Sequence, residues 1–285
     1  MDIVARIVGG RIEAADDRPV PWWSFTKTVL AAAALRLVER GEWRLDAAFD
    51  DHAFSLRQVL SHTAGLPDYG TLRSYHQAVA AGEAPWPTHS LLARVVGELP
   101  APPPGRFAYS NIGYLLLRQA VERQLGCDLD AALRSLVLAP LGLTQTRLAR
   151  SPDDLATTAW GNARRYHPGW VYHGTLIGPL REAVLLLHRL MQGDLLSPAS
   201  LLAMTAPVSQ IGRLPGRPYR DIAYGLGLAM LITDAGPALG HNGQGPGSTG
   251  AVLHFVERGS TVALYADRDD AEALADIERR VIELA

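Results

Sequence analysis

The sequence predicts an α+β fold in which one antiparallel β-sheet is flanked by helices and carries a mainly helical insertion. Runs of strand type lie near both ends of the 285-residue chain, around residues 3–15 and 222–267, and helical patterns fill most of the chain between them. Strands at both ends with helices between them indicate one sheet assembled from the two ends of the chain. Helices around 26–40 and after residue 269 should flank this sheet.

A single domain is expected over residues 1–285, because a chain of this length can bury a large core and no repeat interrupts it. Within this domain, an α/β lobe is expected from about 1–45 and 206–285. A helical lobe is expected from about 46–205.

The N-terminal elements follow from turn and helix signals. Residues 3–8 and 11–14 are short β-type runs, and the two glycines between them are typical of a hairpin turn. Residues 16–21 are expected to form a loop that two prolines confine. Residues 26–40 consist largely of strong helix formers and end before Gly41, which predicts one helix.

The middle of the chain should be mainly helical. The proline-rich residues 100–105 form a stiff, extended segment that leads into a Tyr-Ser-Asn triplet. Residues 151–178 are expected to form irregular polar loops. The helical patterns lie at residues 71–82, 88–98, 112–125, 129–138, 180–192 and 198–204.

From residue 222 onward the pattern changes to short strands. Residues 223–233, 249–257 and 260–267 are of strand type, and a tight turn joins the last two. The glycine-rich residues 240–247 should form an exposed lip that leads into a strand. A terminal helix is expected after Asp269.

The composition excludes several classes of function. The formal net charge is −2, so neither nucleic acid nor a membrane surface is expected as a partner. The nine histidines lack the spacing of metal ligands, and no phosphate-binding glycine loop follows a strand, so no metal or other cofactor is expected. The chain begins without a signal-peptide pattern and has a single cysteine, which together favour a cytoplasmic location. A small molecule is the expected partner, and the oligomeric state is left open.

One lysine stands out among the basic residues. Of the 27 lysines and arginines, only Lys27 is a lysine, and it lies in the first turn of the predicted helix, three residues after Ser24. A helix N-terminus disfavours a cation, and a lysine can lose its proton whereas an arginine in effect cannot. A neutral amine one turn from a serine hydroxyl is a general base in position. The pair therefore predicts a nucleophilic serine.

A structural interpretation of the same residues is open at this stage. Ser24 is equally compatible with an ordinary helix N-cap, and Lys27 with a solvated side chain. The Ser-x-x-Lys pattern alone occurs in many proteins by chance.

Three further motifs follow this one in a fixed order along the chain. The four are Ser-Phe-Thr-Lys at 24–27, Leu-Ser-His-Thr-Ala-Gly-Leu-Pro at 60–67, Tyr-Ser-Asn at 109–111 and His-Asn-Gly at 241–243. In residue type and order they resemble the motifs of the serine β-lactamase-related family, which includes class C β-lactamases, DD-peptidases, D-aminopeptidases and esterases. The likeness extends over nearly the whole chain and implies a β-lactamase/transpeptidase-like fold.

The resemblance implies a role for each catalytic position. Ser24 would attack a carbonyl and form an acyl-enzyme, and Lys27 and Tyr109 would share the proton transfer. Which of these two residues is the base is left open, because such a pair can titrate as a unit.

The resemblance also implies a set of binding residues. Asn111 would orient Lys27 or the substrate amide, and His241 would line the opposite wall of the pocket. The backbone N–H groups of Ser24 and Gln244 would form the oxyanion hole, with Gly243 allowing the backbone to approach the substrate closely. Trp23 would narrow the pocket.

The implied activity is hydrolysis of an ester or amide bond in a small substrate, D-configured substrates included, through an acyl-serine intermediate. One alternative is a true β-lactamase or D-alanyl-D-alanine carboxypeptidase, although a histidine replaces the usual lysine at position 241. Another is a non-catalytic, penicillin-binding-like sensor, although the complete motif set favours an enzyme.

Overall fold

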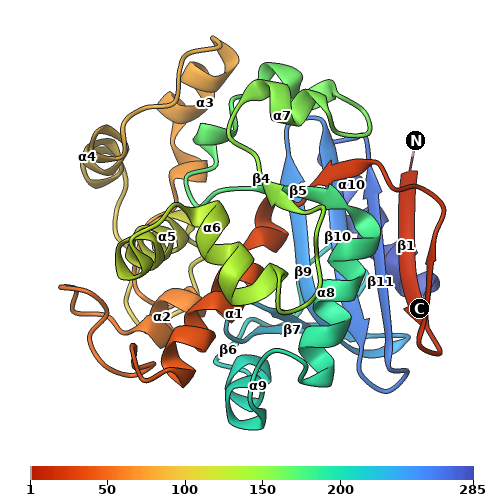
Figure 1. Ribbon diagram of the computed structural model, residues 1–285. Coiled ribbons are helices and arrows are strands. Elements are labelled where there is room, and N and C mark those ends of the chain that lie inside the picture. Colours follow the sequence, from red (N-terminus) through yellow and green to blue (C-terminus); the bar gives the residue numbers. More distant parts are fainter. Residues whose placement is uncertain (1) are drawn as a thin grey trace.

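An eight-stranded antiparallel sheet, built from both ends of the chain, is the centre of the fold (Figure 1). The computed structural model describes residues 2–285, apart from the side chains of Asn162 and Arg164. The strand order is β2-β1-β11-β10-β9-β8-β7-β6, so the first hairpin pairs with the last strand, and the predicted sheet is confirmed. The strands are β1 (Asp2–Val8), β2 (Arg11–Ala14), β6 (Ser209–Gln210), β7 (Asp221–Tyr224), β8 (Ala229–Thr233), β9 (Gly236–Gly245), β10 (Ser248–Phe255) and β11 (Ser260–Ala266).

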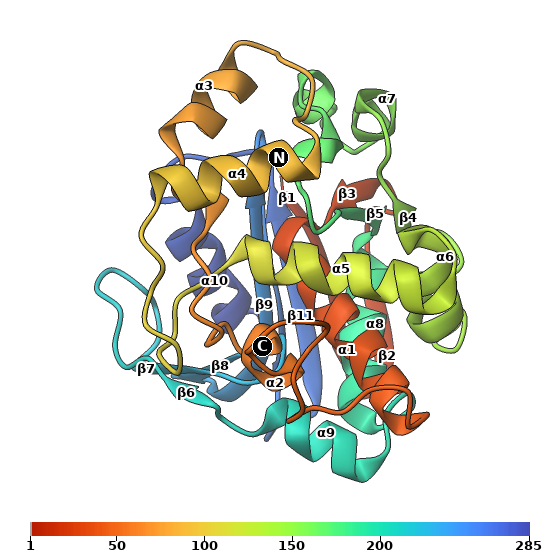
Figure 2. The same cartoon turned by 90° about the vertical axis from the view of Figure 1, so that its left-hand side faces the viewer.

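Helices cover both faces of this sheet. In Figure 2, α8 (Leu180–Gln192) and α10 (Ala273–Glu283) lie on opposite sides of the strands. Successive side chains of β11 point to opposite faces of the sheet. Ala263 and Tyr265 belong to the main core, whereas Val262 and Leu264 pack in the smaller core with α10. A strand covered on both faces is expected to be largely apolar, and every residue of β11 is buried.

The position of α8 corrects the expected lobe boundary. The sequence placed residues 180–192 in the helical lobe, but α8 packs on the sheet, and His188 hydrogen-bonds to Thr261 of β11 at 3.1 Å. Its strongly one-sided pattern of apolar residues explains this, because such a helix must bury one face against a neighbour. The rest of the division into lobes stays a prediction.

The helical part lies beside the sheet and packs around α1 (Thr26–Glu39) (Figure 1). The residues of α1 from Thr26 to Leu35 are all buried. A helix that is apolar on all sides belongs in a core. No helix in residues 2–285 combines the length and hydropathy that a bilayer span requires. The other helices are α2 (Leu56–Leu60), α3 (Arg73–Ala80), α4 (Thr88–Glu98), α5 (Asn111–Leu125), α6 (Leu129–Leu133), α7 (Pro152–Ala156) and α9 (Pro198–Thr205).

A second, three-stranded sheet corrects two loop predictions. β3 (Pro19–Pro21) and β4 (Arg147–Leu148) both pair with β5 (Leu176–Pro179). β3 and β5 lie within the segments predicted as loops at 16–21 and 151–178, whereas β4 lies outside both. Every residue of β5 is buried, so this segment is not the polar loop that its glycines suggested. The β3–β5 pairing joins residues 156 to 160 positions apart, from Pro21 with Ile177 to Pro19 with Pro179, and no local pattern encodes it.

The glycine-rich segment is a strand rather than an exposed lip. Residues 240–245 belong to β9, between β10 and β8, and most of them are buried or half-buried. A Cβ on Gly243 would lie 2.5 Å from the carbonyl oxygen of Trp22, and one on Gly245 would lie 2.5 Å from the Trp23 ring. These glycines therefore let β9 pack directly against Trp22 and Trp23.

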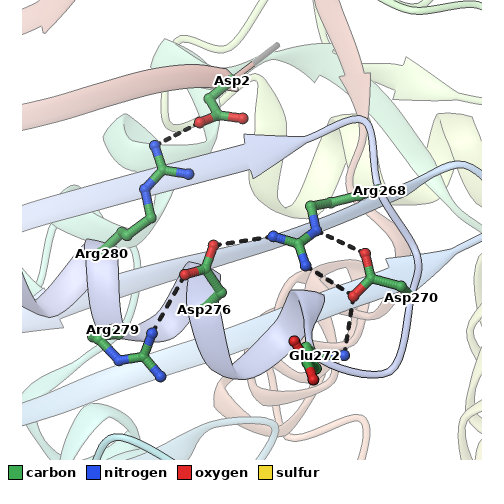
Figure 3. A network of polar contacts seen from close by, with 7 residues as sticks. All are labelled: Asp2, Arg268, Asp270, Glu272, Asp276, Arg279 and Arg280. Carbon is green, nitrogen blue, oxygen red and sulfur yellow. Dashed lines mark hydrogen bonds and ion pairs between the residues drawn. The ribbon is translucent and has the colours of Figure 1, made fainter.

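Ion pairs join the last helix to the first strand (Figure 3). Arg280 of α10 binds Asp2 of β1 at 2.5 Å, and Arg268 binds Asp270 at 2.7 Å. These side chains are partly exposed, so each pair contributes little by itself and the network mainly fixes the helix orientation. The network comprises Asp2, Arg268, Asp270, Glu272, Asp276, Arg279 and Arg280.

Candidate active site

Ser24 lies on a strained turn that leads directly into α1. The 3₁₀ turn Trp23–Phe25 precedes the helix, and Trp23 has a φ of +44°, which is unfavourable for a bulky residue. Two hydrogen bonds hold the turn against β5 and the residue before it: Trp22 N donates to Leu176 O at 2.8 Å, and Trp23 N donates to Thr175 Oγ1 at 3.0 Å. Strain of this kind is held only where the surroundings determine the backbone.

Lys27 is buried directly behind the serine. Its side chain is 0% exposed, and its Nζ lies 3.0 Å from Ser24 Oγ and 3.1 Å from His173 Nε2. Loss of solvation lowers the pKa of Lys27 to about 7, against the opposing attraction of Asp68. A substantial fraction of this lysine is therefore neutral at neutral pH.

The geometry does not fit the structural interpretation of the Ser24–Lys27 pair. Phe25 occupies the N-cap position of α1 and makes no side-chain capping bond, so Ser24 does not cap the helix. A fully buried Lys27 is not a solvated side chain.

Tyr109 faces the lysine from the segment just before α5. The Lys27 Nζ lies 5.1 Å from the centre of the Tyr109 ring, and the His62 ring lies 4.3 Å from it on another side. Burial raises the pKa of Tyr109, and a hydrogen bond with Ser24 works against this increase. The phenol therefore keeps its proton at neutral pH.

Asn111 is held by an aspartate next to the site. Its Nδ2 donates to Asp68 Oδ1 at 2.9 Å, and its backbone N donates to the same oxygen at 3.1 Å. The hydrogen-bonding contacts of the Lys27 amine are instead with Ser24 and His173.

His241 of β9 lies beyond Tyr109, with 6.3 Å between the two ring centres. Its Nε2 is 2.9 Å from the Tyr224 hydroxyl, and its Nδ1 is 2.6 Å from the Asn242 carbonyl oxygen. Burial, together with the nearby Lys27, lowers the pKa of His241 to about 3. The imidazole is therefore neutral and does not supply a fixed positive charge.

A cavity of about 200 Å³ opens beside Ser24. Asn111 and Gln244 line it on the polar side, and aromatic rings form much of the remaining wall. Among the described residues that line it, none is an arginine or a lysine. The lining residues are Trp23, Ser24, Tyr69, Gly70, Tyr75, His76, Asn111, Tyr166, Val171, His173, Gln244, Gly245 and Pro246.

The model of one protein family, described as Beta-lactamase, matches residues 4–285. The chain belongs to the Beta-lactamase family. The resemblance predicted from the four motifs is thus confirmed, and so is the β-lactamase/transpeptidase-like fold.

Solved structures with this fold include a D-amino acid amidase and a D-stereospecific amidohydrolase. D-amino acid amidase from Ochrobactrum anthropi SV3 superposes with a TM-score of 0.83 at 21% identity, covering 99% of this chain and 94% of that one. A D-stereospecific amidohydrolase from Streptomyces sp. gives a TM-score of 0.76 at 21% identity, covering 94% and 89%. At such identities the likeness shows the fold alone.

A curated relative is Penicillin-binding protein 4* of Bacillus subtilis (strain 168), which is 23% identical over 286 residues. The alignment covers 87% of this chain but only 60% of that protein. The chain thus spans less than two thirds of the length of this relative.

The sequence motifs of the family converge in space, but two neighbours of Lys27 were missed. Ser24, Lys27 and Tyr109 lie together, and Ser24, Asn111, Gln244 and Trp23 line one cavity. His173 and Asp68 received no role from the sequence. His173 is 146 positions from Lys27, and no spacing rule connects them.

The structure gives no indication of a metal centre. Within the described part of the chain, no group of three or more His, Cys, Asp or Glu side chains is arranged to hold an ion. The expectation that the protein needs no cofactor stays a prediction.

Proposed function

We propose that this protein is a serine hydrolase that cleaves an ester or amide bond of a small substrate through an acyl-serine intermediate. The observation that carries the proposal is the 3.0 Å contact between Ser24 Oγ and the amine of a fully buried lysine whose pKa lies near 7. A base with such a pKa is well matched to neutral conditions.

Lys27 is the base in this proposal. Its lone pair takes the Ser24 proton as Oγ attacks the substrate carbonyl, and the collapsing intermediate releases an amine or alcohol that receives a proton in return. Tyr109, whose pKa is raised, is suited to donate that proton and be reprotonated from Lys27. A water molecule then attacks the acyl-serine by the same steps in reverse.

The backbone N–H groups of Ser24 and Gln244 are the proposed oxyanion donors, since both residues line the cavity. Gly243 allows β9 to lie against the turn that carries Ser24, as its contact with Trp22 requires. Asn111 and Trp23, which line the cavity, are proposed to contact the substrate. His241, which is not among the lining residues, is proposed to orient the Tyr224 hydroxyl.

We infer that the substrate is a short amide or ester of a D-amino acid rather than a β-lactam. The cavity is small and largely aromatic, and its lining offers no cation for the carboxylate that β-lactams carry. The neutral His241 does not supply one either. The names of the two solved relatives agree with this substrate class.

Intact-protein mass spectrometry tests the proposal after separate exposure to a fluorophosphonate, a penicillin and p-nitrophenyl esters. We expect a covalent adduct on Ser24 with the fluorophosphonate and the esters, and none in Ser24→Ala. Values of kcat/KM for D- and L-amino acid amides, esters and nitrocefin then rank the substrates. A wide margin in favour of nitrocefin would identify a β-lactamase. A stable adduct with penicillin and no turnover of any substrate would favour a non-catalytic, penicillin-binding-like sensor, and the absence of any adduct would overturn the proposal.

A further inference from the structure

His173 is the unassigned side chain that touches the proposed base. It lies just before β5, is 2% exposed, and places its Nε2 3.1 Å from Lys27 Nζ. The segment around it is firmly held: Trp23 N donates to Thr175 Oγ1 at 3.0 Å, and Leu176 N donates to Thr26 Oγ1 at 3.0 Å. The imidazole is therefore fixed relative to the turn that carries the nucleophile.

The imidazole does not improve the packing of this site. His173 Nδ1 is buried and has no hydrogen-bond partner among the described residues. In either neutral tautomer one ring nitrogen can satisfy the lysine contact, while the other is left unpaired. A buried polar atom without a partner destabilises the fold, so an apolar side chain would be more stable here.

A neutral amine needs an external group to fix its orientation. It has two N–H bonds and one lone pair, and rotation about the terminal C–N bond can point any of them toward Ser24. Only the lone pair can accept the serine proton. The resemblance implied that Asn111 orients either Lys27 or the substrate amide, but its Nδ2 donates to Asp68.

We propose that His173 is a positioning residue for Lys27: its Nε2 accepts an N–H of the lysine amine, so that the amine lone pair points at Ser24 Oγ. This inference deepens and rests on the proposed hydrolase function. The required tautomer carries its proton on Nδ1. Because that atom is buried and unpaired, this arrangement reduces the stability of the fold.

The same contact also acts on the protonated lysine. Within this buried site, the ammonium has Ser24 Oγ and His173 Nε2 as polar contacts, with the rings of Tyr109 and Tyr114 at 5.1 and 5.7 Å. A hydrogen bond to a charged group is stronger than one to a neutral group, so His173 favours the ammonium. Removing the acceptor should lower the pKa of Lys27 further.

Other ionisable groups surround Lys27 and His173, and their protonation states must be the same in all the proteins that are compared. Asp68 attracts the lysine charge, and the buried imidazoles would repel it if they were protonated. The groups that face the pair from neighbouring elements are Asp68, His62, His241, Tyr109, Tyr114 and Arg118.

A matched pair of variants separates the hydrogen bond from the packing. His173→Gln places an oxygen acceptor near the position of Nε2, whereas His173→Met has a similar shape and no comparable acceptor. Single-turnover acylation by a p-nitrophenyl ester should fall on the order of 10²-fold in His173→Met and recover largely in His173→Gln. His173→Leu is a second non-accepting variant should His173→Met fail to fold.

A spectroscopic measurement tests the contact without relying on activity. Because Lys27 is the only lysine, labelling with [¹³Cε]lysine gives one side-chain signal whose pH titration reports this amine directly. We expect the midpoint to drop by about one pH unit or more in His173→Met and to return in His173→Gln.

The acylation and titration measurements distinguish a failure of the His173 proposal from a failure of the hydrolase proposal. A His173→Met protein with unchanged lysine midpoint and acylation within about threefold of wild type would overturn the positioning role. The positioning role would also be overturned if acylation fell in both His173→Met and His173→Gln in proportion to their loss of thermal stability, while the Lys27 titration midpoint stayed unchanged. If wild type reacts with no probe, the hydrolase proposal fails, while the titration still decides whether His173 controls Lys27.

Discussion

Lys27 links function and stability through a single proton. The folded state holds its pKa near 7, whereas an unfolded chain would have a lysine pKa of about 10.4. Between these values the unfolded state binds more protons, so the contribution of Lys27 to stability becomes more favourable as pH rises. Below pH 7 the full penalty of burying the ammonium is present.

Replacing Lys27 with methionine should therefore remove activity and increase stability. Methionine has a similar length and no charge, so it fills the site without the desolvation penalty. We expect acylation to fall by about 10²–10⁴-fold, the usual contribution of a positioned acid–base group. Chemical unfolding should show a gain of at least about 1 kcal/mol at pH 6 and a smaller gain at pH 9.

Lys27→Arg is the matched control for this substitution. It keeps the charge but cannot accept a proton at accessible pH, so acylation should fall as far as in the methionine variant. Unlike methionine, the guanidinium should reduce stability, because a permanent charge enters a buried site. If the arginine variant acylates within a few-fold of wild type, Lys27 is not the base.

The Ser24–Lys27 pair could be predicted because the two residues are three positions apart where the 3₁₀ turn continues into α1, and within helical structure sequence spacing fixes distance. The contacts with His173 and Asp68 could not be predicted in this way. They come from loops that the tertiary fold brings to the turn, and neither loop carries a spacing motif that refers to Lys27.

At the scale of elements, the close contact of β9 with the turn at Trp22 and Trp23 leaves no room for side chains at two of its glycines. A Cβ on Gly243 would meet backbone at 2.5 Å, so the strand or the turn must move if a side chain is added. We expect Gly243→Ala to lower the free energy of unfolding by about 1–3 kcal/mol, as overpacking usually does. Acylation should fall as well, since the same shift displaces Gln244 from the oxyanion site.

Gly97→Ala provides a control for this substitution. Gly97 lies in α4, and nothing lies within 4 Å of a Cβ added there. The same change should stabilise the helix by about 0.5–1 kcal/mol and leave acylation unaltered. Equal melting temperatures for the two alanine variants would contradict the proposed packing at β9.

The contact between α8 and the sheet should be sensitive to acid. His188 and His254 both place Nδ1 near Thr261 Oγ1, at 3.1 and 2.9 Å, and burial lowers the pKa of His254 to about 4. The unfolded chain takes up protons near pH 6.5, before the folded state does, so stability should fall as pH drops from about 6.5 toward 4.

His254→Gln tests this linkage by urea unfolding at pH 7.5 and pH 5. The wild type should lose about 1 kcal/mol more than the variant between these two conditions, after allowing for partial solvent screening. Parallel losses in both proteins would place the acid sensitivity elsewhere, for example in His62 or His173, whose pKa values burial also lowers.

Periodicity was sufficient for the long elements and insufficient for the short ones. The helix predicted at 26–40 and the strands near 249–267 are long, apolar and bounded by glycine, and their positions are confirmed. The three-stranded sheet was missed because β3 and β4 have only three and two residues, and their pairing depends on buried contacts with β5.

At the scale of the whole molecule, the sheet joins the two ends of the chain. β1 pairs with β11 from Asp2 to Ile7, and its side chains Ile3, Ala5 and Ile7 enter the main core. The expectation of one sheet from both ends followed from where the strand-type runs lie. Which strand would be the neighbour of β1 had to come from the structure, since register depends on long-range packing.

Deleting residues 1–14 should abolish function although it removes none of the proposed catalytic groups. The deletion strips β1 and β2 from the sheet, withdraws three core side chains and leaves the edge of β11 unpaired, although every residue of β11 is buried in the intact fold. An open, apolar strand edge promotes aggregation. We expect loss of the cooperative thermal transition, self-association in gel filtration, and no adduct with the fluorophosphonate.

The matched control keeps β1 and replaces residues 9–14 with a flexible glycine–serine linker that connects Val8 to Ala15. It removes only β2, whose four residues are all exposed, and should therefore retain the fold and acylate at a rate close to wild type. A monomeric, reactive protein lacking residues 1–14 would show that the N-terminal strand is dispensable for the site.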